Sequence, residues 1–302
     1  MPSNQFNITR RSLLKAGTMV AITAAIPFSV NANANRPLRY AFSHSWSNIV
    51  AQTYIGAQLI RERVGYPVEL VTLEPALAFA ALQSGQADLY SDTYLEGLDA
   101  LNGDYRGGMA EYVKKVADSI DIVGIAQGPQ SQGLAVPKYV TINSIDELNS
   151  SADKFSNQII GIEPGSGVMN TVEEVIKAYD LKLQLRPGSD ATVAAAVKRA
   201  VLREEWIVVT AWEPTPIWNQ VELKYLEDPK KLLMKESYYN FHSVRKDFVS
   251  NFPKALDFLK KFQMSVKDIA QVMDWIDGGQ APDAAADRWI KSNAEKVEKW
   301  FS

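Results

Sequence analysis

A strand, a glycine-rich turn and a helix follow one another in the stretch QIIGIEPGSGVMNTVEEVIKAY, residues 158–179. Its first five residues, QIIGI, are mostly β-branched and apolar, which is typical of a buried strand. One proline and two glycines then make a turn over residues 163–167, and a helix is predicted to run on to Tyr179. A strand that leads through a tight turn into a helix is the repeating unit of parallel sheets.

This alternation continues on both sides of the stretch. The predicted strands cover residues 38–43, 67–73, 87–92, 134–137, 158–162, 182–186 and 207–210. The predicted helices cover residues 48–63, 75–84, 144–148, 168–179 and 190–202, with another from about Tyr94 and mostly helical chain after Val244. Ser47 or Asn48 is expected to cap the first of these helices.

The length of 302 residues is more than one compact core usually takes. Two α/β series follow one another with no linker or repeat between them, so we predict two lobes joined by crossings of the chain. The predicted fold class is α/β, each lobe being a mostly parallel sheet flanked by helices. A small ligand is expected in the cleft between the lobes, outside the carboxyl ends of the strands.

The sequence contains no cysteine and only two histidines, His44 and His242. This excludes disulfides, thiolate metal sites, a cysteine nucleophile and a lipid-modified N-terminal cysteine. With two histidines a multi-histidine metal centre is not expected either, so we predict no metal and no cofactor. The net charge of −3 argues against nucleic acid and anionic lipid as partners.

Residues 1–34 are predicted to be an export signal. Arg10 and Arg11 form a basic region, residues 19–30 are apolar, and residues 31–34 offer a small-residue cleavage site. The segment TRRSLLK, residues 9–15, resembles the twin-arginine export motif, and an ordinary secretory signal is the alternative. Either route predicts a soluble periplasmic protein without a lipid anchor.

Sequence patterns typical of catalysis are missing. No G-x-S-x-G turn accompanies the two histidines, and no G-x-G-x-x-G or Walker-type loop follows a strand. Residues 163–167, at the start of a helix, could hold a carboxylate through backbone N–H groups, or could simply make a tight turn. We therefore predict no catalytic residue and no enzyme. An exported enzyme on this scaffold would need an acid/base pair from Asp92, Glu163 and Glu213, the only carboxylates near the predicted cleft. Their neighbours instead indicate cation recognition or a structural role at a strand end.

Three aromatic residues follow three different predicted strands: Trp46, Tyr94 and Trp212. Strand ends point toward the cleft in this class of sheet. Each residue taken singly could belong to the core, but three in equivalent places favour a shared ligand site. Several ring faces around one space suit an organic cation without N–H donors.

The sequence resembles the glycine betaine and choline substrate-binding proteins of ABC importers. The resemblance rests on seven segments in family order: FSHSWSN (42–48), LEPALAFAAL (73–82), residues 88–95, GLAVP (133–137), IGIEPGSGVM (160–169), residues 206–214 and KYLEDP (224–229). It implies a periplasmic-binding-protein fold that closes on its ligand. Lobe 1 would comprise residues 36–133, lobe 2 residues 134–238, and residues 239–302 would return to lobe 1.

The resemblance also implies the ligand and its site. An aromatic box of Trp46, Tyr94 and Trp212 would enclose a methylated ammonium group. Five polar residues are candidates for the rest of the ligand: Asn48, Gln132, Ser166, Gly167 and Asn170. The expected partners are a quaternary-ammonium osmoprotectant and a membrane permease, and we expect a monomer.

The sequence departs from its relatives at three places. Tyr94 stands where many relatives have tryptophan, Gln132 matches a box tyrosine of a choline-binding relative, and Thr215 replaces a histidine. These changes make the box more polar and leave the ligand open between glycine betaine, proline betaine, choline and carnitine. The alternative is the same receptor role for a sulfonium such as dimethylsulfoniopropionate, an amino acid or another small polar solute.

Overall fold

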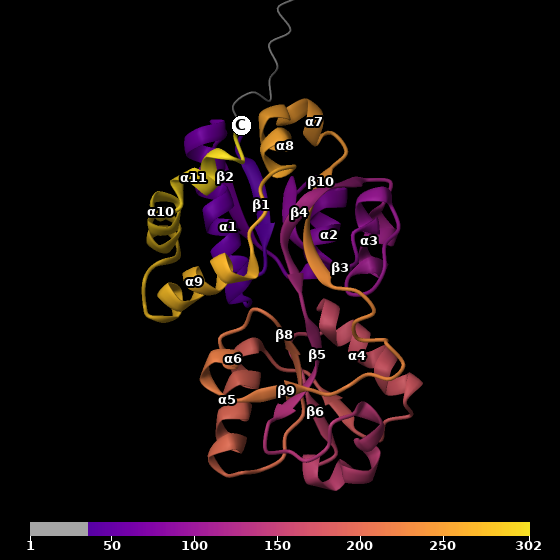
Figure 1. Ribbon diagram of the computed structural model, residues 1–302. Helices are drawn as coiled ribbons and strands as arrows, with labels where there is room; N and C mark the ends of the chain where they lie inside the picture. The colour runs from indigo at the N-terminus through magenta and orange to yellow at the C-terminus, as the bar shows by residue number, and fades with distance from the viewer. Residues whose placement is uncertain (1–35) are drawn as a thin grey trace, which may run out of the picture. The chain divides into compact units, whose positions relative to one another are not determined.

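The computed structural model describes residues 36–302 (Figure 1), so the predicted export signal lies outside the described residues. These residues form two five-stranded sheets. The first has the order β2-β1-β3-β10-β4, with bounds β2 Val68–Thr72, β1 Leu38–Phe42, β3 Leu89–Glu96, β10 Tyr238–Arg245 and β4 Ile120–Gln130. The second has the order β7-β6-β8-β5-β9, with bounds β7 Gln184–Arg186, β6 Gln158–Ile160, β8 Val209–Trp212, β5 Gln132–Pro137 and β9 Leu223–Tyr225.

One strand in each sheet runs against the other four. In the first sheet β10 is antiparallel to both of its neighbours, β3 and β4. In the second sheet β5 is antiparallel to β8 and β9. Each reversed strand follows a crossing of the chain between the sheets, the first at residues 130–132 and the second at residues 225–238. The predicted two-lobe α/β fold with mostly parallel sheets is confirmed. We call the part built on the first sheet lobe 1 and the part built on the second sheet lobe 2.

Helices flank both sheets (Figure 1). Those of lobe 1 before the first crossing are α1 Ser47–Leu59, which continues as a π-helix over Ile60–Val64, α2 Pro75–Ser84 and α3 Ala110–Val116. Those of lobe 2 are α4 Gly167–Ala178, α5 Asp190–Leu202 and α6 Ile217–Gln220. After the return to lobe 1 come α7 Phe248–Asn251, α8 Pro253–Leu259, α9 Val266–Asp277, α10 Pro282–Ser292 and α11 Ala294–Glu298. Single turns of 3-10 helix lie at Asp99–Asn102 and Ile145–Glu147, and a longer one at Asn149–Phe155.

The predicted helix from about Tyr94 is wrong. β3 continues through this residue to Glu96, and every residue of the strand is buried. Tyr94 and Leu95 pair with residues of β10, which lies about 150 positions later in the chain. Local sequence patterns do not report such a distant partner, and β10 and β4 were themselves missed for the same reason. Tyr94 therefore lies within a central strand.

The start of α1 also differs from the prediction. Trp46, and not Ser47 or Asn48, is the N-cap residue of this helix, with an extended backbone at φ −111° and ψ 111°. Its side chain is free to point away from the helix because it makes no capping hydrogen bond. The helix therefore begins directly behind Trp46, which brings Asn48 into its first turn.

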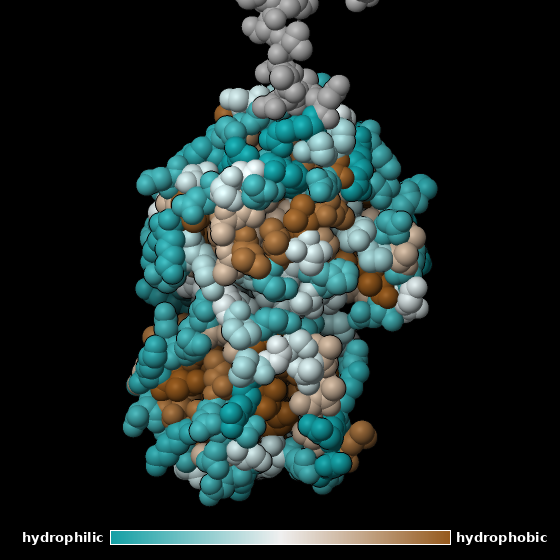
Figure 2. Space-filling view, turned by 180° about the vertical axis from the view of Figure 1, so that it is seen from behind, coloured by the Kyte–Doolittle hydropathy of each residue, from teal (hydrophilic) through white to brown (hydrophobic). Residues whose placement is uncertain are grey.

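The core of lobe 1 continues into the C-terminal helices. Apolar side chains of β1 and α1 share one buried cluster with residues of α8, α9 and α10, including Trp289. Seen from behind, the outer surface is mostly hydrophilic, with apolar patches on each lobe (Figure 2). None of the helices in residues 36–302 is both long and apolar enough to cross a membrane. The C-terminal helices thus fix α1, and with it the position of Trp46.

Candidate functional site

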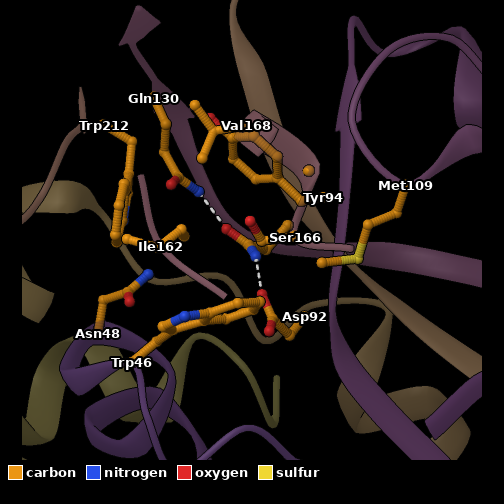
Figure 3. A pocket seen from close by; sticks show the side chains of 12 residues that line it. Trp46, Asn48, Asp92, Tyr94, Met109, Gln130, Ile162, Ser166, Val168 and Trp212 are labelled. Atoms are coloured by element: carbon orange, nitrogen blue, oxygen red, sulfur yellow. Dashed lines mark hydrogen bonds between the residues drawn. The ribbon is translucent and has the colours of Figure 1, made fainter. Parts of the chain in front are cut away.

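A pocket lies between the two lobes and takes its walls from both (Figure 3). Lobe 1 contributes Trp46, Asn48, Asp92, Tyr94, Met109, Gln130 and Asn240. Lobe 2 contributes Ile162, Ser166, Gly167, Val168 and Trp212. The free volume between these side chains is about 30 Å³, room for roughly one or two water molecules. A larger solute therefore enters only if the walls move apart.

The structure brings the three predicted aromatic residues together in this pocket. Trp46, Tyr94 and Trp212 are 5%, 7% and 8% exposed. They come from the N-cap of α1, from β3 and from the last residue of β8. Two lie in lobe 1 and one in lobe 2, so all three rings meet only when the lobes are close. That they bind a ligand remains a prediction.

Neighbouring residues contact the rings of Tyr94 and Trp46 and the backbone of Trp212. The Tyr94 ring stacks on the ring of Tyr238, with centroids 4.7 Å apart and 15° between the planes. The indole Nε1 of Trp218 donates a hydrogen bond of 2.9 Å to the backbone carbonyl of Trp212. The indole Nε1 of Trp46 donates a hydrogen bond of 3.0 Å to the carboxylate of Glu163 in lobe 2. The Tyr94 ring is thus supported within lobe 1, whereas the contact of Trp46 forms only when the lobes are close.

Three of the five predicted polar residues line the pocket: Asn48, Ser166 and Gly167. Ser166 is the N-cap residue of α4, and its buried Oγ has no hydrogen-bond partner among the described residues. The backbone N–H groups in the first turn of a helix also lack partners within the helix. This side of the pocket therefore offers a free hydroxyl beside the positive end of a helix dipole.

The other two predicted polar residues do not line the pocket. Gln132 lies at the first chain crossing, where its Nε2 donates a hydrogen bond of 3.0 Å to the Leu233 carbonyl in the second crossing. Asn170 lies one turn into α4, and its Nδ2 donates to the Gly108 carbonyl in lobe 1 at 3.3 Å. Both side chains connect parts of the protein around the pocket and do not face its interior.

Sequence reasoning missed several residues of the pocket walls: Met109, Gln130, Ile162, Val168 and Asn240. Gln130 and Asn240 come from β4 and β10, two of the strands that were not predicted. Asp92 was considered as a possible catalytic acid, with cation recognition or a structural role at the strand end as the favoured alternatives. One signal was available for it, because residues two apart on a strand share a face, and Asp92 is two residues before Tyr94.

Asp92 is the only acidic or basic side chain among the described residues that line the pocket. Its carboxylate accepts hydrogen bonds from the Tyr90 hydroxyl at 3.1 Å and from Nδ2 of Asn240 at 2.5 Å. Burial raises the pKa of Asp92 well above its usual value, against the hydrogen bond from Tyr90. The side-chain amide of Asn240 is itself held in place, because Nε2 of Gln130 donates a hydrogen bond to its Oδ1 (dashed lines in Figure 3).

The described residues contain no cluster of three or more histidine, cysteine or acidic side chains that could hold a metal ion. The two remaining carboxylates considered for catalysis, Glu163 and Glu213, do not line the pocket. What the site offers is therefore a set of aromatic faces, a buried carboxylate and a free helix N-terminus. These are groups for holding a small solute.

A pocket shared by two lobes, with the chain crossing twice between them, defines a bilobal solute-binding protein. The chain belongs to the family described as the substrate binding domain of ABC-type glycine betaine transport systems (OpuAC), which matches residues 42–292. This is a family of transport receptors and not of enzymes.

Individual relatives agree with this assignment. The glycine betaine/carnitine transport binding protein GbuC of Listeria monocytogenes is 32% identical over 164 residues, 53% of this chain and 54% of that protein. The chain thus aligns with about half the length of this curated relative. Lactococcal OpuAC, whose crystal structure holds glycine betaine in a closed conformation, is 31% identical with a TM-score of 0.78, over 88% of this chain and 100% of that one. The glycine betaine/L-proline-binding protein ProX of Borrelia burgdorferi is 25% identical, also with a TM-score of 0.78, over 88% and 96%.

Proposed function

We propose that this protein is the extracytoplasmic receptor of an ABC importer and binds a small quaternary-ammonium compound. The observation that carries the proposal is the meeting of Trp46, Tyr94 and Trp212 in one pocket between the lobes. The relatives that bind glycine betaine or carnitine support the same ligand class.

The aromatic faces account for recognition of the onium group. A methylated ammonium has no N–H donors, so it is held by the electrostatic attraction of ring faces and by burial of its methyl groups. Each face contributes about 0.5–2 kcal/mol when desolvated. Three faces together with hydrogen bonds to the rest of the ligand would give micromolar affinity, about −8 kcal/mol.

The N-terminus of α4 accounts for the other end of the ligand. The free Oγ of Ser166 and the first backbone N–H groups of the helix can donate hydrogen bonds. A carboxylate or a hydroxyl would accept them. The same pocket thus suits a betaine and a choline-like alcohol.

Ligand binding would favour the closed arrangement of the lobes because the walls of the pocket come from both of them. The closed form would then present its surface to a membrane permease. This role requires export to the periplasm, as residues 1–34 suggest, and involves no chemical change in the ligand. We expect the receptor to act as a monomer.

A tryptophan-fluorescence titration tests the proposal directly, because two tryptophans line the pocket. The ligands are glycine betaine, choline, carnitine and dimethylsulfoniopropionate, with glycine and proline as controls. We expect a saturable change with at least one quaternary-ammonium compound and none with the controls. A saturable change with dimethylsulfoniopropionate alone would identify the protein as a receptor for sulfonium compounds. No change with any of the four compounds would refute the proposal.

A further inference from the structure

Two carboxylates of lobe 1, Asp88 and Asp92, are buried four residues apart in the chain, with 1% and 2% exposure. Asp88 forms ion pairs with Arg36 at 2.7 Å, with Arg39 at 3.0 Å and with Arg245 at 3.5 Å. Burial alone would raise the pKa of Asp88, but the hydrogen bonds from the two nearer arginines outweigh it, and the pKa is lowered. The protein thus supplies Asp88 with the positive charges that a buried carboxylate needs.

Asp92 has no such partner. Among residues 36–302 no arginine, lysine or histidine forms an ion pair with it, and its two hydrogen-bond donors, Tyr90 and Asn240, are neutral. The charged and titratable groups around it are Glu74 at the start of α2 and the phenols of Tyr40, Tyr90 and Tyr94. None of them brings positive charge, and Glu74 adds a like charge.

A compensating positive charge can reach Asp92 from the pocket, since Asp92 lines it together with the aromatic residues. We propose that Asp92 is the counter-ion of the ligand's onium group and selects positively charged ligand heads over neutral ones of the same shape. The proposal rests on the proposed function, which it makes more specific. It goes beyond an aromatic box, because ring faces alone also accept neutral apolar groups.

The hydrogen bonds of Asp92 fit this role. Tyr90 and Asn240 already donate to its two oxygens, and Gln130 holds the Asn240 amide in the donating orientation. What the carboxylate lacks is therefore a compensating positive charge and not a further hydrogen-bond donor. A quaternary ammonium supplies positive charge without any donor, so it leaves these hydrogen bonds undisturbed.

Ligand pairs that differ only in charge test the proposal. Choline is compared with its neutral carbon isostere, 3,3-dimethylbutan-1-ol, and glycine betaine with 3,3-dimethylbutanoate. In the variant Asp92→Asn we expect the affinity for the onium member to fall about tenfold or more. The affinity for the carbon isostere should stay the same or rise. Asp268→Asn removes another buried carboxylate of lobe 1, one paired with Lys296 outside the pocket, and should leave both ratios unchanged.

An equal loss for both members of a pair in Asp92→Asn would mean that Asp92 only maintains the pocket, and would overturn the proposal. The wild type supplies a second measurement in case this variant does not fold. An onium group needs the ionised carboxylate, so its affinity should weaken as Asp92 is protonated, by up to about tenfold per pH unit. This measurement uses choline and 3,3-dimethylbutan-1-ol, because 3,3-dimethylbutanoate takes up a proton of its own in this range. The affinity for 3,3-dimethylbutan-1-ol should not follow the protonation of Asp92 between pH 8 and pH 4. Identical pH dependence for both members would also overturn the proposal.

These outcomes separate the two proposals. If the wild type binds no onium compound, the proposed function fails. If it binds one but the ratio to the isostere is the same in wild type and Asp92→Asn, the receptor stands and the counter-ion role alone is rejected.

Discussion

The indole Nε1 of Trp46 donates a hydrogen bond of 3.0 Å to the carboxylate of Glu163 across the two lobes. Trp46 ends the connection from β1 to α1, and Glu163 stands in the turn between β6 and α4. The bond therefore joins a strand-to-helix turn of lobe 1 to a strand-to-helix turn of lobe 2. The two residues are more than 100 positions apart in the sequence. It also fixes the plane of a ring that lines the pocket, so closure and ring orientation depend on one contact.

Removing this acceptor should weaken ligand binding. A hydrogen bond to a charged group contributes about 1.5–3 kcal/mol, part of which is available only when the lobes are closed. We expect Glu163→Ala to lower the affinity for the bound onium compound about fivefold or more. Glu163→Gln keeps an acceptor oxygen and should lose less. A fluorescence titration of both variants measures the difference, and equal affinities in Glu163→Ala and wild type would show that the bond does not contribute to closure.

Trp212 should contribute more to ligand affinity than to stability. It is the wall of the pocket that lobe 2 supplies from β8, and its truncation removes one ring face. We expect Trp212→Ala to lower onium affinity about tenfold or more, measured by calorimetry. Trp206→Ala is the matched control, because Trp206 packs on Phe155 in the same lobe and does not line the pocket. Equal affinities in the two variants would contradict the aromatic box.

Gly167 lines the pocket at a place where lobe 2 approaches lobe 1 closely. A Cβ at this position would lie 2.7 Å from Cδ1 of Tyr94 and 3.1 Å from the Cα of Gly108, both in lobe 1. We expect Gly167→Ala to hinder closure and lower affinity about tenfold, with little change in melting temperature. The control is Gly188→Ala, whose Cβ would crowd Thr192 and Gly161 within lobe 2. That variant should lose stability and keep its ligand affinity. Unchanged affinity in Gly167→Ala would show that a side chain at this position does not hinder closure of the lobes.

His242 should make the stability of lobe 1 sensitive to acid. Its Nε2–H donates to the Phe262 carbonyl at 2.8 Å, and in the neutral ring its Nδ1 accepts from the Ser91 hydroxyl at 2.7 Å. Burial lowers the pKa of His242 to about 4. The unfolded chain binds a proton near pH 6.5 and the folded chain only near pH 4, so stability is fully present above pH 6.5. It then falls by about 1.4 kcal/mol per pH unit between these values.

Urea unfolding of wild type and His242→Gln at pH 7 and pH 5 measures this effect. Glutamine can donate and accept in the same directions but does not titrate. We expect the wild type to be the more stable protein at pH 7, and its advantage to shrink by about 2 kcal/mol at pH 5. A constant difference at the two pH values would show that His242 is not responsible for the acid sensitivity.

Much of the fold was predictable because its units are local. Residues 158–179 define a strand, a turn and a helix through neighbouring residues alone, and the helix at residues 190–202 has the predicted bounds. β10 and β4 could not be found in this way. β10 pairs with β3 on one side and with β4 on the other, and these segments approach each other only after the chain has crossed twice between the lobes.

The sequence by itself determined the βα units, the absence of cysteine chemistry and the three aromatic residues of the pocket. Each of these depends on residue type and on spacing along the chain, which are the same in the unfolded and the folded protein. Only the tertiary structure decided that Gln132 and Asn170 turn away from the pocket, and that Gln130 and Asn240 enter it beside Asp92. It also decided that, among residues 36–302, Asp88 has three cationic partners while Asp92 has none. The physical reason is that burial and charge pairing depend on strands distant in sequence, and these meet only in the folded protein.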